Sequence, residues 1–251
     1  MGGAAVNSYS DAFAWLADPA HWAGATGIPH RLLEHLGYTG LTLLIAIAIG
    51  LPVGLYIGHT GRGREIVVPF TGALRALPTL GLVIILALGL GTGILAPLIA
   101  LVILALPPII AGAYAGLQSV DREVVDAARS VGFTGGGVLW QVEVPLALPL
   151  IVGGIRSACL QVIATWTVAA FLPLGGLGRF LYDALPNQDY AQLLAGSILV
   201  IVLALLADGL FALVQRLATP KGVAAGRTAD IRTKTHSPTR KDPSWLAPEE
   251  A

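Results

Sequence analysis

The chain has 251 residues, of which 55% are hydrophobic and only 12% are charged, and its formal net charge is +0. Because a soluble domain usually carries about 25% charged residues, this composition argues against a soluble globular protein. The balanced charge also gives no reason to expect nucleic acid as a partner. The composition is instead typical of a protein whose surface faces lipid.

Residues 1–35 come before the first long apolar run. Within them, the range 13–35 is expected to form a short interfacial helix, because Trp15 and Trp22 suit the headgroup level of a membrane. This end has no basic region followed by an apolar stretch, so a cleaved signal peptide is not expected. The first true apolar run would itself direct insertion into the membrane.

Five apolar segments follow, and each approaches or exceeds the roughly 20 residues that an α-helix needs to cross a bilayer. They cover residues 36–58, 71–90, 94–117, 146–172 and 192–214. None shows the alternation of a membrane barrel, and backbone groups in lipid must be satisfied within their own segment, so we expect helices. Residues 36–217 are therefore predicted to form one all-α, polytopic transmembrane domain.

Glycines recur at every fourth position in the first span, as Gly50, Gly54 and Gly58. Gly112 and Gly116 repeat this spacing in the third span. Such spacing places small residues on one helix face, where a neighbouring backbone can approach closely. We expect these faces to pack helices of the same chain, and a contact between two subunits is the alternative.

Three prolines interrupt the second and third spans, namely Pro78, Pro107 and Pro108. A proline inside a helix removes a hydrogen bond and kinks the helix, and the freed backbone groups are tolerated where they face protein or a watery cavity. Spans two, three and four are therefore predicted to line a translocation path. Trp166 and the adjacent Thr165 are the candidate lining side chains of the fourth span, and packing is the alternative role of Trp166.

Few ionisable residues lie at membrane depth in this sequence. Arg156 lies in the fourth span, and Asp208 lies towards the end of the fifth. Because a charge at the bilayer centre is costly, we expect both to face the helix bundle or a span end, and Asp208 could pair with a basic neighbour.

Basic residues concentrate on one side of the predicted spans. Arginines lie between the first and second spans and between the third and fourth, whereas the opposite side carries only Arg31 and Arg179. The positive-inside rule therefore places the N-terminus outside the cell and the C-terminus in the cytoplasm. Residues 218–251 turn polar and proline-rich, so we expect a disordered cytoplasmic tail.

The connection between the third and fourth spans, residues 118–145, is predicted to contain a short amphipathic helix on the cytoplasmic side. Asp121 is a good N-cap, and Gly132 can end the helix in a left-handed turn. The charged face consists of Arg122, Asp126 and Arg129. The apolar face consists of Val124, Val125, Ala128 and Val131. A helix that merely lies on the bilayer is the alternative.

The spacing within this connection resembles the EAA loop of bacterial ABC importer permeases. That motif reads Glu-Ala-Ala, three residues, Gly, nine residues and then Ile-x-Leu-Pro. The matching residues here are Asp126, Ala127, Ala128, Gly132, Val142, Val144 and Pro145. Asp126 keeps the negative charge of the glutamate on a shorter arm, and the two valines are mild replacements.

Further features are similar to the permeases for glycine betaine, choline and proline betaine. They are Gly-Gly-Ile-Arg at 153–156, Gly-Gly-Leu-Gly at 175–178, Ser-Val-Asp at 119–121 and the prolines Pro78, Pro107 and Pro108. The likeness covers about residues 36–216. It implies the type I ABC importer permease fold and a compatible solute, such as glycine betaine, choline, proline betaine or carnitine, as substrate.

The resemblance also implies that ATP binding and solute passage belong to separate subunits. A separate cytoplasmic ATPase would bind ATP and magnesium, and the loop helix would dock in a groove on it through Asp126 and its apolar face, including Val125. An exterior binding protein would deliver solute to a pair of permeases, identical or homologous, in the bacterial inner membrane. The sequence has no Gly-x4-Gly-Lys-Ser/Thr phosphate loop, so the chain is expected to bind no ATP and no other cofactor.

Three other functions are alternatives. An ABC permease for another small solute, such as an amino acid, would share the loop. A secondary carrier would need an acidic relay or inverted repeats, and the sequence shows one intramembrane acid and no repeat. A membrane enzyme would need a catalytic or metal-binding constellation, which the sequence does not show, so no catalytic or metal site is expected.

Overall fold

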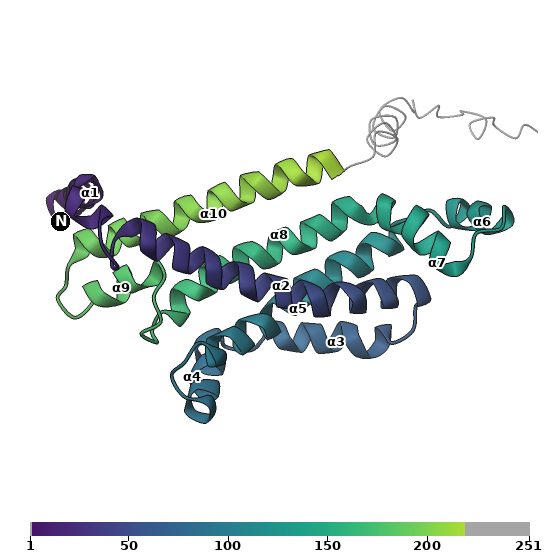
Figure 1. Cartoon of the computed structure of the whole chain (residues 1–251), viewed down its shortest axis with the longest axis horizontal. Helices are drawn as coiled ribbons and strands as arrows, with labels where there is room; N and C mark the ends of the chain where they lie inside the picture. The colour runs from purple at the N-terminus through teal and green to yellow at the C-terminus, as the bar shows by residue number, and fades with distance from the viewer. Residues whose placement is uncertain (1, 219–251) are drawn as a thin grey trace, which may run out of the picture.

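The computed structural model describes residues 2–218, with side chains from residue 9 onwards, and the regular structure of this part is helical (Figure 1). Four long helices form the main bundle: α2 (Ile28–Thr60), α5 (Leu95–Gln118), α8 (Val144–Ala169) and α10 (Tyr190–Ala218). The shorter helices are α1 (Gly2–Ala17), α3 (Arg64–Arg75), α4 (Thr79–Leu90), α6 (Arg122–Ser130), α7 (Gly135–Val138) and α9 (Gly178–Ala184). A 3-10 turn, Pro19–Trp22, follows α1, and a π turn, Leu139–Glu143, joins α7 to α8.

Four helical segments are long and apolar enough to cross a membrane, and the bent pair α3–α4 makes up to five. The prediction of an all-α polytopic protein with about five spans is confirmed. Helices α1 and α9 lie at one end of the bundle and α6 and α7 at the other (Figure 1). By the charge rule, the α6 end is cytoplasmic. The predicted tail, residues 218–251, lies outside the described residues except for Ala218.

The N-terminal boundaries differ from the prediction, because residues 13–35 do not form one helix. Helix α1 ends at Ala17, and the side chain of Asp18 caps the 3-10 turn by accepting from the N–H of Ala20 at 2.9 Å. Gly24 then has a φ of 81°, a left-handed conformation that interrupts a helix. Pro29 lies in the first turn of α2, where its fixed φ favours helix initiation, so the first long helix starts well before residue 36.

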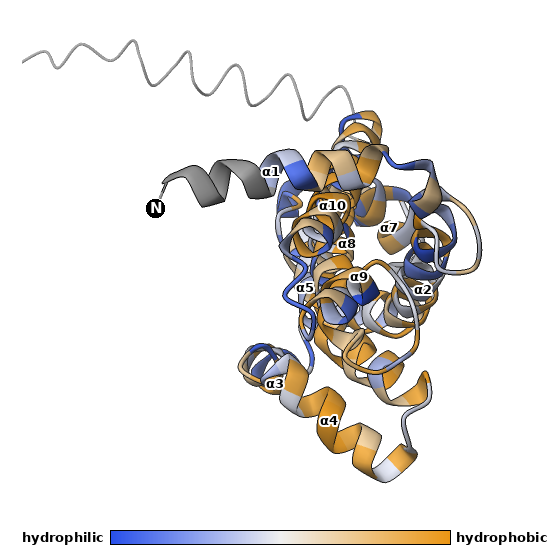
Figure 2. Cartoon of the chain, turned by 90° about the vertical axis from the view of Figure 1, so that its left-hand side faces the viewer, coloured by the Kyte–Doolittle hydropathy of each residue, from blue (hydrophilic) through white to orange (hydrophobic). Residues whose placement is uncertain are grey.

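The second predicted span, residues 71–90, is not a single kinked helix. Helix α3 starts at Arg64 and ends at Arg75, and α4 starts after Pro78 with a bend of 92° between the two. Proline disfavours the helical conformation of the residue before it, here Leu77, so the helix breaks at this point. In Figure 2 the largely hydrophobic α4 points away from the bundle, and only Val83 of this helix is buried.

Helix α5 packs against α2 on one face and against α8 on another. A Cβ built on Gly54 of α2 would lie 2.6 Å from the Cβ of Ala113 on α5. A Cβ built on Gly112 of α5 would lie 2.7 Å from the Cα of Gly154 on α8. Only glycine permits such close approach of two helix backbones, so the prediction that the spaced glycines pack helices of one chain is confirmed.

Helix α5 continues through Pro107 and Pro108. Pro108 has no N–H to donate to the carbonyl oxygen of Leu104, one turn earlier. The side-chain Nε2 of Gln161 on α8 donates to that oxygen instead, at 3.1 Å. A polar side chain of the neighbouring helix therefore satisfies the backbone group that the proline frees, as the apolar interior requires.

Replacing Gly54 with alanine should lower the stability of the detergent-solubilised protein by about 1–3 kcal/mol, the usual cost of overpacking. The added methyl group would lie 2.6 Å from the Cβ of Ala113 and 2.9 Å from the backbone oxygen of Ile110. The control is Gly209→Ala in α10, where a Cβ meets nothing within 4 Å. Thermal unfolding midpoints measure the effect, and equal midpoints for both variants would contradict the close packing of α2 on α5.

Candidate functional site

The predicted loop helix is present as α6, between the end of α5 and α7. Its N-cap is Asp121, whose Oδ1 accepts a hydrogen bond from the backbone N–H of Glu123 at 2.9 Å. Glu123 lies in the first turn and Arg129 in the last, so both charges interact favourably with the helix dipole. Local residues therefore define where this helix starts, as the sequence predicted.

Local hydrogen bonds also define the C-terminal end of α6. Gly132 has a φ of 94°, and its N–H donates to the oxygen of Arg129 at 3.0 Å. The next N–H, of Phe133, donates to the oxygen of Ala128 at 3.2 Å. These two bonds form a Schellman motif, which favours glycine at the left-handed position. The predicted left-handed stop at Gly132 is confirmed.

The chain returns to the bundle through α7 and the π turn. Thr134 caps α7 by accepting from the N–H of Gly137 at 3.2 Å. In the π turn, the N–H of Val144 donates to the oxygen of Leu139, five residues earlier. Val142 and Pro145, the last residues of the predicted coupling motif, are half-buried here. A π turn is uncommon and is frequent at functional sites.

No side chain of α6 is buried. Val125 and Ala128 are half-buried. The exposed residues of the predicted motif and the apolar face are Val124, Asp126, Ala127 and Val131. Asp126 and Arg129 form a loose, exposed ion pair at 3.8 Å. Helix α6 therefore presents both apolar and charged groups beyond the end of the bundle.

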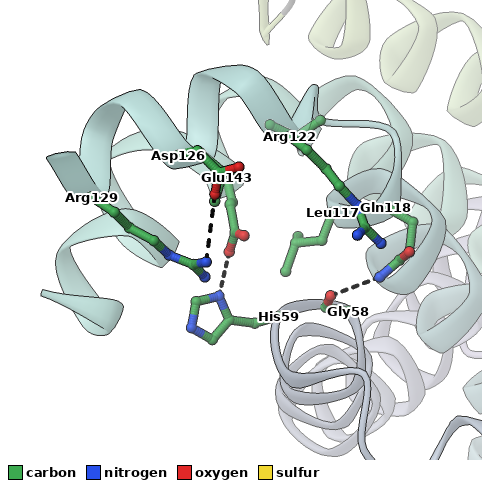
Figure 3. A pocket seen from close by; sticks show the side chains of 10 residues that line it. Gly58, His59, Leu117, Gln118, Arg122, Asp126, Arg129 and Glu143 are labelled. Atoms are coloured by element: carbon green, nitrogen blue, oxygen red, sulfur yellow. Dashed lines mark hydrogen bonds and ion pairs between the residues drawn. The ribbon is translucent and has the colours of Figure 1, made fainter. Parts of the chain in front are cut away.

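A cavity of about 260 Å³ lies between α6 and the cytoplasmic ends of α2 and α5 (Figure 3). Arg122, Asp126 and Arg129 line it from the α6 side. His59, the second-to-last residue of α2, and Glu143 of the π turn also line the cavity. The cavity is therefore a polar space at the base of the loop helix.

Two side-chain hydrogen bonds join helices beside this cavity (Figure 3). Nδ1 of His59 donates to Oε2 of Glu143 at 2.5 Å. Nε2 of Gln118, the last residue of α5, donates to the oxygen of Gly58 at 3.0 Å. None of these roles was predicted from the sequence. The available signal was Glu143 itself, an acid between the two motif valines.

The residues predicted for the translocation path lie in two different surroundings. Pro107 and Pro108 are buried in α5, and Trp166 is buried in α8 with Thr165 half-buried beside it. Pro78 is exposed at the break between α3 and α4. The structure therefore does not bring Pro78 into the buried group.

Trp166 packs α8 against α2. Its Nε1 donates to Oγ1 of Thr42 at 3.0 Å, and its ring stacks on Tyr38 with centroids 4.9 Å apart. These contacts correspond to the packing role considered for Trp166. That Trp166, Thr165 and the three prolines line a path stays a prediction.

The intramembrane arginine has a partner. Arg156 on α8 donates to both carboxylate oxygens of Asp208 on α10, from Nε at 2.6 Å and from NH2 at 2.7 Å. This fork-to-carboxylate geometry is the strong form of an arginine ion pair. The expected pairing of Asp208 with a basic neighbour is confirmed, and it joins the last helix to the bundle.

At the exterior end, α2 holds the glycine-rich connection before α9. Oε2 of Glu34 accepts from the N–H of Gly176 at 2.8 Å, and the hydroxyl of Tyr38 donates to the oxygen of Leu174 at 2.6 Å. Gly175 and Gly176 have φ angles of 106° and 79°, which L-residues with side chains rarely adopt. Gly175 and Gly176 thus allow the left-handed backbone of this connection, which is hydrogen-bonded to α2.

Residues 50–219 match the model of the family described as binding-protein-dependent transport system inner membrane component. The chain belongs to this family. The match includes the loop helix, the cavity residues and the helices on both sides of them. This permease is therefore a multi-pass inner-membrane component of an ABC importer, and its family is one of transport components rather than catalytic subunits.

Individual relatives agree with the family. The permease is 29% identical over 190 residues to the glycine betaine/carnitine/choline transport system permease protein OpuCB of Bacillus subtilis (strain 168), covering 76% of this chain and 88% of that protein. It is 34% identical over 198 residues to the osmoprotectant import permease protein OsmW of Salmonella typhimurium, covering 76% and 91%.

A solved structure supports the fold. The inward-facing MetNI methionine ABC transporter has a chain that is similar with a TM-score of 0.69 and 21% sequence identity, covering 81% of this permease and 100% of that chain. The predicted type I importer permease fold is therefore confirmed.

Substitution of Gly132 by alanine should loosen the end of α6. A left-handed conformation costs an L-residue roughly 1–2 kcal/mol, so we expect amide exchange at 128–134 to become about tenfold faster. Gly136→Ala is the matched control, because both glycines have open space around the missing Cβ and only Gly132 has a positive φ. Hydrogen exchange of the purified permease, followed by mass spectrometry, compares the two, and identical exchange would refute the role of the left-handed turn.

Proposed function

We propose that this permease imports compatible solutes such as glycine betaine, choline, proline betaine or carnitine. The observation that carries the proposal is its similarity over most of its length to OpuCB and OsmW, whose names specify such solutes or osmoprotectants. The glycine-rich residues 175–178, which resemble those of glycine betaine, choline and proline-betaine permeases, give further support.

The partner of α6 is proposed to be a cytoplasmic ATPase subunit. Three properties support this: the helix lies at the cytoplasmic end, both of its termini are capped, and no side chain on it is buried. In this proposal Val125, Asp126, Ala127 and Ala128 form the docking surface, with Gly132 holding its end and Val142 and Pro145 connecting it to α8. ATP and magnesium bind to that subunit, and this chain binds no cofactor of its own.

A second permease and an exterior binding protein complete the proposed assembly. Helix α4 exposes large apolar side chains, including Ile85 at 68% and Leu88 at 83%. A second permease, identical or homologous, together with lipid would cover such a surface. The binding protein would deliver solute at the opposite end of the bundle from α6, where α1 and α9 lie. Alternating access between the two ends then moves the solute inwards.

An amino-acid permease is the alternative within the same class. The likeness to MetNI concerns the fold, since the sequences are only 21% identical. A secondary carrier is disfavoured, because the family is binding-protein-dependent.

Cells that carry the whole transport system should take up radiolabelled glycine betaine or choline in an ATP-dependent way. An excess of unlabelled carnitine or proline betaine should compete, whereas methionine and histidine should not. Gly132→Val should reduce uptake at least about tenfold at an unchanged membrane level, because a β-branched residue does not tolerate its left-handed φ.

Gly136→Ala serves as the control for this assay and should transport normally. Wild-type uptake of neither solute would refute the compatible-solute proposal and leave the family assignment in place. Full uptake by Gly132→Val would show that the end of α6 does not matter for coupling.

A further inference from the structure

The attachment of α6 to the membrane helices is indirect. Its main packing partners in the described chain are α7 and the π turn, rather than the long helices. A force applied to α6 must therefore reach the bundle through the end of α5 on one side and through α7 and the π turn on the other. The second route is the one that leads into α8.

The second route, through α7 and the π turn, contains a segment with few internal hydrogen bonds. A π turn is a rare interruption of regular α-helical hydrogen bonding, and two prolines follow it closely, Pro145 and Pro149. Neither proline can donate a backbone hydrogen bond to the preceding turn. The start of α8 therefore has fewer internal bonds than the rest of the helix, and it needs an external support to move as a rigid unit.

His59 supplies such a support from α2. Its Nδ1 donates to Glu143, the last residue of the π turn, at 2.5 Å, and the Glu143 residue is only 7% exposed. Its other ring nitrogen, Nε2, faces the start of α7, since a Cβ built on Gly135 would lie 3.8 Å from it. The His59 ring thus bonds to the π turn and lies close to the start of α7 (Figure 3 shows its contact with Glu143).

We propose that His59 and Glu143 are positioning residues that transmit the movement of α6 to the transmembrane helices. Through this bond, a displacement of the π turn moves α2 together with α8, while Gln118 and Gly58 hold α5 to α2 at the same level. Without it, the π turn absorbs the displacement and the bundle does not follow. This inference rests on the proposed docking of an ATPase on α6.

The test compares His59→Phe, Glu143→Leu and the double variant in proteoliposomes that contain the complete purified transporter. The solute is the one that the uptake assay identifies, and both solute uptake and ATP hydrolysis are measured. We expect each variant to hydrolyse ATP but to move about tenfold less solute per ATP, as for loss of one charge-assisted hydrogen bond. His59→Asn, whose amide N–H can replace the Nδ1 donor, should retain most of the wild-type ratio.

The double variant separates coupling from stability. His59→Phe leaves the buried Glu143 without its partner, and Glu143→Leu leaves the half-buried His59 without its partner. The double variant leaves neither group unpaired and should assemble normally. If the double variant regains the wild-type ratio of solute to ATP, the pair only stabilises the fold and the proposal is wrong. Wild-type ratios in both single variants would overturn it as well. If one of the single variants does not assemble, the ratio of solute to ATP in the double variant decides between a role in coupling and a role in stability alone.

His30→Phe is the matched control, because His30 forms another histidine–glutamate contact in the described chain, with Glu34 at 3.3 Å, and that contact lies in the first turns of α2. It should leave the ratio of solute to ATP unchanged. A wild-type permease that co-purifies with no ATPase would instead refute the proposed function. The two failures are therefore distinguishable, since one concerns the wild type and the other only the variants.

Discussion

The close contact of α5 with α2 and α8 is the constraint on which the rest of the bundle depends. Apolar side chains gain little from leaving lipid for another apolar surface, so helices in a membrane associate through tight packing and a few polar bonds. Glycines allow the tight packing where Gly54 meets Ala113 and where Gly112 meets Gly154. Once α5 lies this close to α8, Gln161 can reach the backbone oxygen of Leu104 that Pro108 leaves free.

Because these helices lie so close together, α2 also forms hydrogen bonds to the segments directly before and directly after α8. At the exterior end, Glu34 and Tyr38 of α2 bind the connection that follows α8. At the cytoplasmic end, His59 binds Glu143 just before α8 begins. Helices α2, α5 and α8 are thus tied together at several levels. Helix α4 packs on this group through one face, where Val83 is buried, and exposes large apolar side chains such as Ile85 and Leu88 on the other.

The proposed coupling to an ATPase depends on the contrast between the closely packed helices α2, α5 and α8 and the exposed helix α6. Helix α6 has capped ends and no buried side chain, so it is a defined surface with few direct ties to the core. A helix with capped ends can be displaced by a force and still keep its helical structure. Under the proposed coupling, the polar bonds at its base determine how much of that force reaches the membrane helices.

The sequence by itself determined the features that depend on neighbouring residues: the apolar spans, the cap at Asp121, the left-handed stop at Gly132 and the glycine faces. It did not determine the 92° bend after α3, since Pro78 disfavours a helical conformation at Leu77 but does not set the direction in which the next helix leaves. The bonds of His59 to Glu143 and of Trp166 to Thr42 join residues 84 and 124 positions apart. Such partners are chosen by how whole helices pack, because hydrophobic periodicity places a residue on a face without specifying which helix covers that face.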